Sequence, residues 1–193
     1  MTDSQRGGMI VAIIIFSLGV YYFLWVRQPA GAGTPDSTAA ASLQTPVVTA
    51  NASMEKGKPA PDFSFKTMDG KPIALSSYIG QKPVVLDFWA TWCGPCKQEL
   101  PKLQEFYATN SDKVEIIAVT SEDPQAVGNI GTVVSQLGLT FPIVHDPSNK
   151  ISAMYPTRGI PYVIFIGRDG TVLDTALGYN PNIGDEITRI CGL

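Results

Sequence analysis

The chain has 193 residues, and its 14 Lys and Arg against 17 Asp and Glu give a net charge of −3, which excludes a nucleic-acid-binding protein that works through bulk basic charge. Three cysteines are too few for a small domain held together by disulfides. Residues 1–54 contain only four of the 31 charged residues. The composition therefore predicts two poorly charged leading segments, residues 1–27 and 28–54, followed by one globular domain over residues 55–193.

The first segment contains a long apolar run. Gly7–Val26 is 20 residues without a charge, and as a helix it would be about 30 Å long, which matches the hydrocarbon core of a bilayer. Aromatic residues cluster near its far end and Arg27 follows them, as at a membrane interface. We expect residues 1–27 to form a membrane anchor with one transmembrane helix. A signal peptide cleaved near Ala30-Gly31-Ala32 is the competing interpretation.

The second segment has the composition of a tether. Residues 28–54 contain one charge and no aromatic residue, and 19 of the 27 are Ala, Ser, Thr, Pro or Gly. Such a segment has too little apolar surface to offset the entropy of ordering it. It predicts a flexible linker that holds the domain away from the membrane.

From Pro61 onward the pattern alternates between strands and helices. The apolar residues that flank the turn at residues 68–71 predict an N-terminal β-hairpin. The other expected elements are a buried central strand over 84–89, a helix whose apolar spacing begins at Cys96, a strand over 114–119, a helix opened by Pro124 with an apolar stripe from Val127 to Leu137, strands over 141–144, 162–166 and 172–176, and a closing helix over 183–190. This order predicts an α/β sandwich with a partly parallel sheet.

The most informative motif is Cys93-Gly94-Pro95-Cys96, which follows the central strand and opens the first long helix. A thiol at a helix N-terminus has its pKa lowered from about 8.5 into the range of roughly 3.5–7.5. Cys96 lies one helical turn away, within reach of a disulfide. We therefore expect Cys93 to be the attacking nucleophile and Cys96, the more buried cysteine, to be the resolving thiol. A structural disulfide would constrain the unfolded chain little, because it closes a very short loop. A zinc site would need further ligands.

The stretch from Phe88 to Pro101, with its Cys-Gly-Pro-Cys motif, resembles the thioredoxin superfamily, and most closely its TlpA/ResA-like membrane-anchored branch. The resemblance covers roughly residues 59–190 and includes Gly159-Ile160-Pro161. It implies a thioredoxin-like three-layer sandwich and thiol–disulfide exchange without a cofactor. It also implies a position in the periplasm or on the outer face of the bacterial cytoplasmic membrane.

The same resemblance implies a function in the reduction of disulfides in partner proteins, often during cytochrome c or copper-oxidase assembly. One membrane helix cannot carry electrons, so a transmembrane thiol donor is an expected partner. The Gly94-Pro95 pair resembles reducing thioredoxins more than oxidants. Tyr162 stands where the cytochrome c reductase subgroup usually has Glu, which puts membership of that subgroup in doubt. Oxidase or isomerase activity and, less strongly, a copper-binding module are the alternatives.

Two carboxyl groups are candidates for moving protons. Asp87 interrupts the apolar central strand, where an unpaired carboxylate is costly, so we expect its pKa to be raised and its carboxyl group to accept the Cys96 proton. It aligns with the buried acid of thioredoxin, whereas many TlpA-like proteins have Asn there. Glu99 follows Cys96 by three residues and aligns with a Glu common in the TlpA/ResA branch. A carboxylate without a kinetic role, for Asp87, and a solvated helix residue, for Glu99, are the alternatives.

Five residues are candidates for contact with the substrate: Trp92, Gly94, Pro95, Ile160 and Pro161. By resemblance, the Ile160–Pro161 bond is cis and faces the disulfide, so that the Ile160 backbone pairs with an extended substrate segment. Trp92, next to Cys93, either covers the thiol or contacts substrate, and a packing residue is the alternative. His145 is more often a loop residue than a ligand, and no metal site is predicted. Cys191 is an odd cysteine without an assigned role.

Overall fold

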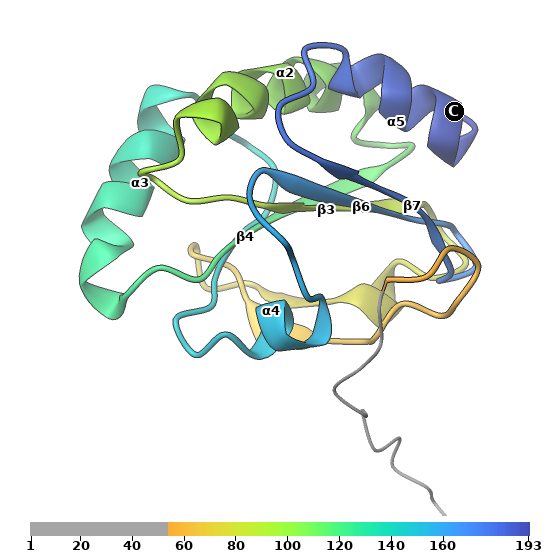
Figure 1. The fold of residues 1–193 in the computed structure, drawn as a ribbon, viewed down its shortest axis with the longest axis horizontal. Coiled ribbons are helices and arrows are strands. Elements are labelled where there is room, and N and C mark those ends of the chain that lie inside the picture. Colours follow the sequence, from red (N-terminus) through yellow and green to blue (C-terminus); the bar gives the residue numbers. More distant parts are fainter. Residues whose placement is uncertain (1–53) are drawn as a thin grey trace, which may run out of the picture. The chain divides into compact units, whose positions relative to one another are not determined.

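A five-stranded sheet with the strand order β5-β4-β3-β6-β7 forms the centre of the computed structural model, which describes residues 54–193 (Figure 1). Its strands are β3 (Val84–Phe88), β4 (Glu115–Thr120), β5 (Ile143–His145), β6 (Tyr162–Ile166) and β7 (Val172–Leu177). Strands β3, β4 and β5 are parallel, whereas β6 and β7 complete the sheet in antiparallel pairs. The mixed sheet places the carboxyl end of β3 beside the amino end of β6, because Phe88 pairs with Tyr162.

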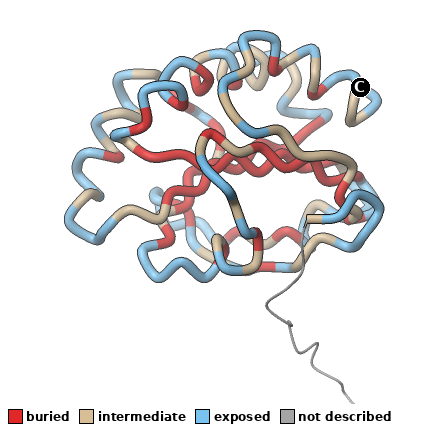
Figure 2. Tube along the Cα trace, in the orientation of Figure 1, coloured by how far each residue is buried: buried red, intermediate tan, exposed pale blue. Residues whose placement is uncertain are grey.

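Successive side chains of β3 point to opposite faces of the sheet, as strand geometry requires, and all five of its residues are buried. Val85 belongs to the core under three helices, which are α2 (Gly94–Asn110), α3 (Val127–Gln136) and α5 (Ile183–Cys191). Leu86 belongs to a second core on the opposite face. Figure 2 shows the buried sheet between these outer layers, whose solvent-facing sides are exposed.

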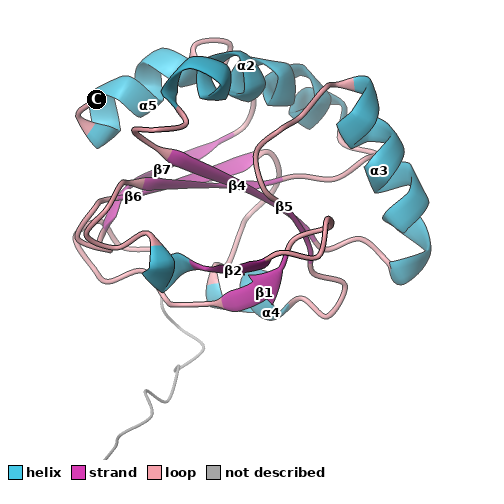
Figure 3. Cartoon of the chain, turned by 180° about the vertical axis from the view of Figure 1, so that it is seen from behind, coloured by secondary structure: helices cyan, strands magenta, loops and turns pink. Residues whose placement is uncertain are grey.

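The second face is covered by shorter elements. Strands β1 (Ser64–Lys66) and β2 (Pro72–Ala74) form an antiparallel hairpin, which lies with α4 (Lys150–Met154) on the side of the sheet away from α2 and α5 (Figure 3). Tyr155 is fully buried there and donates a hydrogen bond to the carbonyl of Pro61. Three layers result, with the central sheet in the middle.

The helices differ from the sequence prediction in two places. The chain forms a 3₁₀ turn, η2 (Pro124–Ala126), before α3 begins. Val127, expected on the apolar stripe, is 49% exposed, so the prediction was wrong there, and the buried face of α3 starts at Ile130. Helix α4 was not predicted, because five residues are too few to reveal a helical period.

The N-terminal side of the described chain is attached to the start of β7. Gly57 donates a backbone hydrogen bond to Val172, Val172 donates one to Lys58, and Ala60 donates one to Gly170. Val172 pairs with Ile166 at one end of the sheet, whereas Leu177 pairs with Tyr162 at the other end. No helix within residues 54–193 has the length and apolar character needed to cross a membrane, and the expected anchor lies outside the described residues.

Candidate active site

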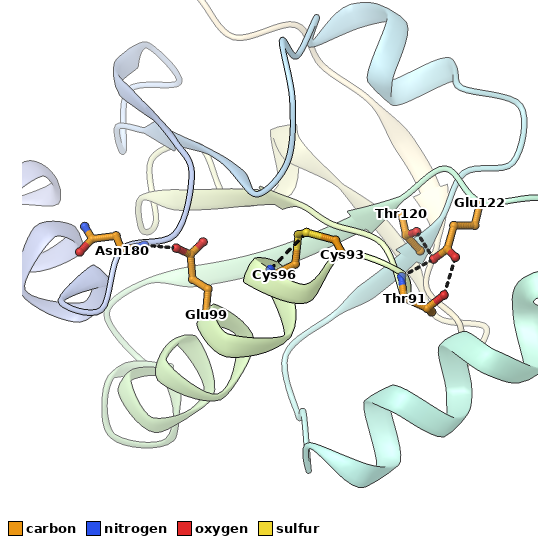
Figure 4. Close-up of a disulfide and its surroundings, with 7 residues drawn as sticks. All are labelled: Thr91, Cys93, Cys96, Glu99, Thr120, Glu122 and Asn180. Carbon is orange, nitrogen blue, oxygen red and sulfur yellow. Dashed lines mark hydrogen bonds between the residues drawn. A yellow bond between two sulfur atoms is a disulfide. The ribbon is translucent and has the colours of Figure 1, made fainter.

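A disulfide joins Cys93 and Cys96 at the junction between β3 and α2, with Cα atoms 5.3 Å apart. Cys93 is the N-cap residue of α2, and its sulfur accepts a hydrogen bond from the backbone N–H of Cys96 at 3.2 Å (Figure 4). The N-terminus of α2 thus points a backbone N–H that has no carbonyl partner within the helix at Cys93 Sγ, where a thiolate would form on reduction. Both cysteines are buried, Cys93 with 4% and Cys96 with 1% of its surface exposed.

Asp87 lies in the middle of β3 and is 1% exposed. It points to the face covered by α2, because it alternates with Leu86 and Phe88, which belong to the opposite core. Its Oδ1 atom has no hydrogen-bond partner. Burial, and then repulsion by Glu99, raises the pKa of Asp87 well above its usual value, as the interrupted apolar strand predicted.

Glu99 is buried on the inner side of α2, with 1% of its surface exposed, so the alternative of a solvated helix residue is wrong. Its Oε2 atom accepts a hydrogen bond from the backbone N–H of Asn180 at 2.7 Å, and its Oε1 atom has no partner. Burial is the largest effect on its pKa, which is raised although the bond from Asn180 favours the charged form. Repulsion by Glu186 acts in the same direction as burial.

Unpaired buried polar atoms occur in residues close to Cys93 and Cys96 in the sequence. In the part of the chain that the structure describes, the buried side-chain nitrogen and oxygen atoms without a partner are Asp87 Oδ1, Trp89 Nε1 and Glu99 Oε1. Trp89 belongs to the same core as Cys93 and Cys96. Each such atom costs stability, and two of the three belong to carboxyl groups whose pKa is raised. This is the pattern expected where proton transfer, and not stability, determines the residue type.

Of the five predicted substrate-contact residues, three are next to the cysteines in the sequence, and Ile160 packs against the core that contains both cysteines. Gly94 and Pro95 are exposed at the start of α2, and Trp92 is 73% exposed, which rules out a packing residue at that position. The Ile160–Pro161 peptide bond is cis, as the resemblance implied. Ile160 and Trp92 line one pocket of about 240 Å³.

Sequence reasoning missed Glu122, which follows β4. Its carboxylate accepts hydrogen bonds from the Thr91 backbone N–H at 2.8 Å, the Thr91 hydroxyl at 2.6 Å and the Thr120 hydroxyl at 3.0 Å (Figure 4). It therefore fixes the segment that leads from β3 to Cys93. A charged residue two positions after a buried strand was the only signal, and its partner Thr91 is 31 residues away in sequence.

Two other candidates from the sequence take no part in the redox centre. His145 lies at the end of β5, and its Nε2 atom is 2.8 Å from the backbone carbonyl oxygen of Glu122. Cys191 is a half-buried free thiol at the end of α5, and burial raises its pKa to about 11. Among residues 54–193, no three His, Cys, Asp or Glu side chains are grouped so as to hold a metal ion.

Comparison with known proteins agrees with this site. Residues 56–175 match the AhpC/TSA family. The chain belongs to this family. Within the family it is similar to a thiol-disulfide oxidoreductase ResA of Bacillus thuringiensis (strain Al Hakam), with 39% identity over 127 residues that make up 65% of this chain and 71% of that relative.

Solved structures of thiol–disulfide exchange proteins have a similar fold. A Chlorobium tepidum protein assigned as a thiol:disulfide interchange protein DsbE has a TM-score of 0.64 and 30% identity, covering 71% of this chain and 95% of that one. StoA from Bacillus subtilis has a TM-score of 0.58 and 29% identity, covering 67% and 96% respectively. The fold is thioredoxin-like, and the chain is a thiol–disulfide oxidoreductase that acts on disulfide-bearing proteins.

Proposed function

We propose that this oxidoreductase works as a reductase, tethered by residues 1–27 to the outer face of the bacterial cytoplasmic membrane. One observation carries the reaction. The N-terminus of α2 supplies a backbone donor to Cys93 Sγ, so Cys93 is the sulfur best suited to exist as a thiolate. Cys96 N–H is that donor, and Cys96 Sγ is within bonding distance of the nucleophile.

In the proposed cycle the Cys93 thiolate attacks one sulfur of a substrate disulfide. A Cys93–substrate bond forms, the substrate S–S bond breaks, and one substrate thiolate leaves. Cys96, once deprotonated, attacks Cys93 Sγ and releases the second substrate thiol. The substrate disulfide has then taken up two electrons from the Cys93–Cys96 pair and become two thiols, while the pair itself remains as a disulfide. A transmembrane thiol donor returns two electrons to it.

Asp87 and Glu99 are the proposed acceptors of the Cys96 proton. Asp87 lies on the face of β3 that α2 covers, and Glu99 lies on the inner side of α2. Each has a carboxyl oxygen without a hydrogen-bond partner. Because burial raises both pKa values, each group is a stronger base when ionised than an exposed carboxylate. A buried carboxylate of this kind takes up a proton from a thiol more readily than a solvated carboxylate does.

The direction of exchange is tested by trapping the redox state in the cells that produce the protein. Acid quenching followed by alkylation should find Cys93 and Cys96 mainly as thiols, because a reductase is kept reduced by its donor. A mainly oxidised pair would indicate an oxidase instead. The Cys96→Ala variant should accumulate mixed disulfides through Cys93, and the captured proteins identify the substrates, with cytochrome c or copper-oxidase assembly factors as the expected class.

Membrane anchoring is tested by fractionation. We expect the full chain to remain with membranes after a carbonate wash, because 20 uncharged residues match the bilayer thickness. Residues 55–193 alone should be released as soluble protein, and they serve as the matched control. Recovery of a mature N-terminus near Gly33 would contradict the anchor and indicate a cleaved signal peptide.

A further inference from the structure

Glu122 lies on the side of Cys93 opposite to Glu99 (Figure 4), and it lines a pocket of about 240 Å³. Trp92 and Ile160 both line it, so it adjoins the residue before the nucleophile and the residue before the cis proline. A substrate segment that reaches Cys93 between these residues must pass the pocket. The side chains that flank the substrate cysteine are therefore the groups that can enter it.

The residues that line the pocket are of two chemical kinds, apolar and polar. Phe88, Val119 and Ile160 provide apolar surface, whereas Ser121, Ser152 and Thr157 provide hydroxyl groups. Of the described residues that line it, Glu122 alone carries a charge. A lining that combines apolar surface with hydroxyl groups and one carboxylate fits a long side chain that has a methylene stem and a polar head.

The charge of Glu122 is not balanced by a basic side chain. Its three hydrogen bonds come from neutral groups, the Thr91 N–H and the hydroxyls of Thr91 and Thr120. None of the ion pairs within residues 54–193 includes it. A carboxylate has about four acceptor positions, so one remains for a further donor. A cationic donor there would make a charge-assisted hydrogen bond.

Trp92 adds a second feature that favours a cation. Its side chain is 73% exposed at the rim of the same pocket, and an indole face attracts an ammonium or guanidinium group. We propose that this pocket binds a lysine or arginine side chain beside the cysteine of the substrate disulfide, with Glu122 as the residue that determines this preference. The inference rests on the proposed function and specifies its substrate class.

The test uses symmetrical disulfides of short peptides that differ in one residue beside the cysteine, either lysine or its neutral isostere norleucine. The residue is placed in turn at each flanking position. Pre-reduced protein is mixed with each peptide disulfide, and the released peptide thiol is measured by chromatography. We expect the second-order rate constant of this single turnover to be about fivefold higher for lysine than for norleucine at one position, and this preference should decrease with rising ionic strength.

Two variants distinguish an effect of the pocket on the lysine preference from an effect of general surface charge. Glu122→Gln keeps a side chain of the same size but removes the charge, and it should reduce the preference to about twofold or less. Asp123→Asn removes the neighbouring exposed charge, which does not line the pocket, and it should leave the preference unchanged.

The ratio of the two peptide rates decides the outcome. Equal rates for lysine and norleucine at every position in the unaltered protein would overturn the proposal, and this comparison needs no variant. Glu122→Gln slowing both peptides equally would also overturn it, leaving Glu122 only the function of fixing Thr91. Failure to reduce either peptide would instead contradict the proposed reductase function.

Discussion

Replacing Cys93 with serine is expected to abolish disulfide reduction. A hydroxyl in this position cannot attack a disulfide at neutral pH, and Cys96 is the more buried of the two cysteines. Insulin reduction followed by turbidity should fall by about a hundredfold or more, to the rate of the added dithiol alone. Cys96→Ala should retain the first attack but stop at the mixed disulfide.

The difference in reactivity between the two thiols can be measured independently in reduced protein. Near pH 7, Cys93 should react with iodoacetamide much faster than Cys96, because the helix N-terminus favours its thiolate. Cys191→Ala is the matched control, since burial raises the pKa of that thiol to about 11 and its loss should leave activity unchanged. Equal alkylation of Cys93 and Cys96, or an active Cys93→Ser variant, would contradict the assignment.

Replacing Asp87 with asparagine is expected to stabilise the oxidised protein at pH 7. Burial raises the folded-state pKa of Asp87 well above its usual value. The folded protein therefore binds this proton more tightly than the unfolded chain does, and stability falls as pH rises above the unfolded pKa, near 3.9. The loss stops above the folded pKa. It amounts to about 1.4 kcal/mol for each unit between the two pKa values.

The pH dependence of the stability gain determines how the experiment is done. Asp87→Asn should raise the free energy of unfolding at pH 7 and above, with little gain near pH 4, where the carboxyl group is protonated in the folded protein and only about half ionised in the unfolded chain. Denaturant unfolding at several pH values measures this. Ser121→Ala, at a half-exposed site outside the core, is a control that should show no such pH dependence. An unchanged stability at every pH would contradict the burial argument.

The same variant also tests proton transfer. If Asp87 accepts the Cys96 proton, Asp87→Asn should release mixed disulfides more slowly. A stabilised variant with normal release would assign that proton to Glu99, and Glu99→Gln should then slow release. Comparing the two variants in the resolving step therefore separates the two carboxyl groups.

Local sequence signals predicted the redox centre well. The Cys-Gly-Pro-Cys motif, the apolar strand interrupted by Asp87 and the position of Cys93 at a helix start all depend on neighbours a few residues away. Strand β6 begins and ends where the continuous apolar run does, at Tyr162 and Ile166. Continuous apolar runs are reliable here because the sheet is covered on both faces.

The parts that were missed depend on contacts between distant segments. The burial of Glu99 could not be decided from helical spacing, because its partner Asn180 lies 81 residues away. The bonds of Glu122 to Thr91 cross from β4 to the loop after β3. Neither pairing leaves a periodic trace in the sequence, so only the folded arrangement of the strands reveals them.

The attachment of residues 57–60 to the start of β7 determines at which end of the sheet the N-terminal side of the described chain joins the domain. These residues are bonded beside Val172, which lies at the end of the sheet opposite to Tyr162 and Phe88, and the disulfide follows Phe88. A force applied through the N-terminal side of the described chain would therefore act at the end of the sheet near Val172. The redox centre lies at the opposite end, so β3 would not bear that force directly while the disulfide approaches a partner.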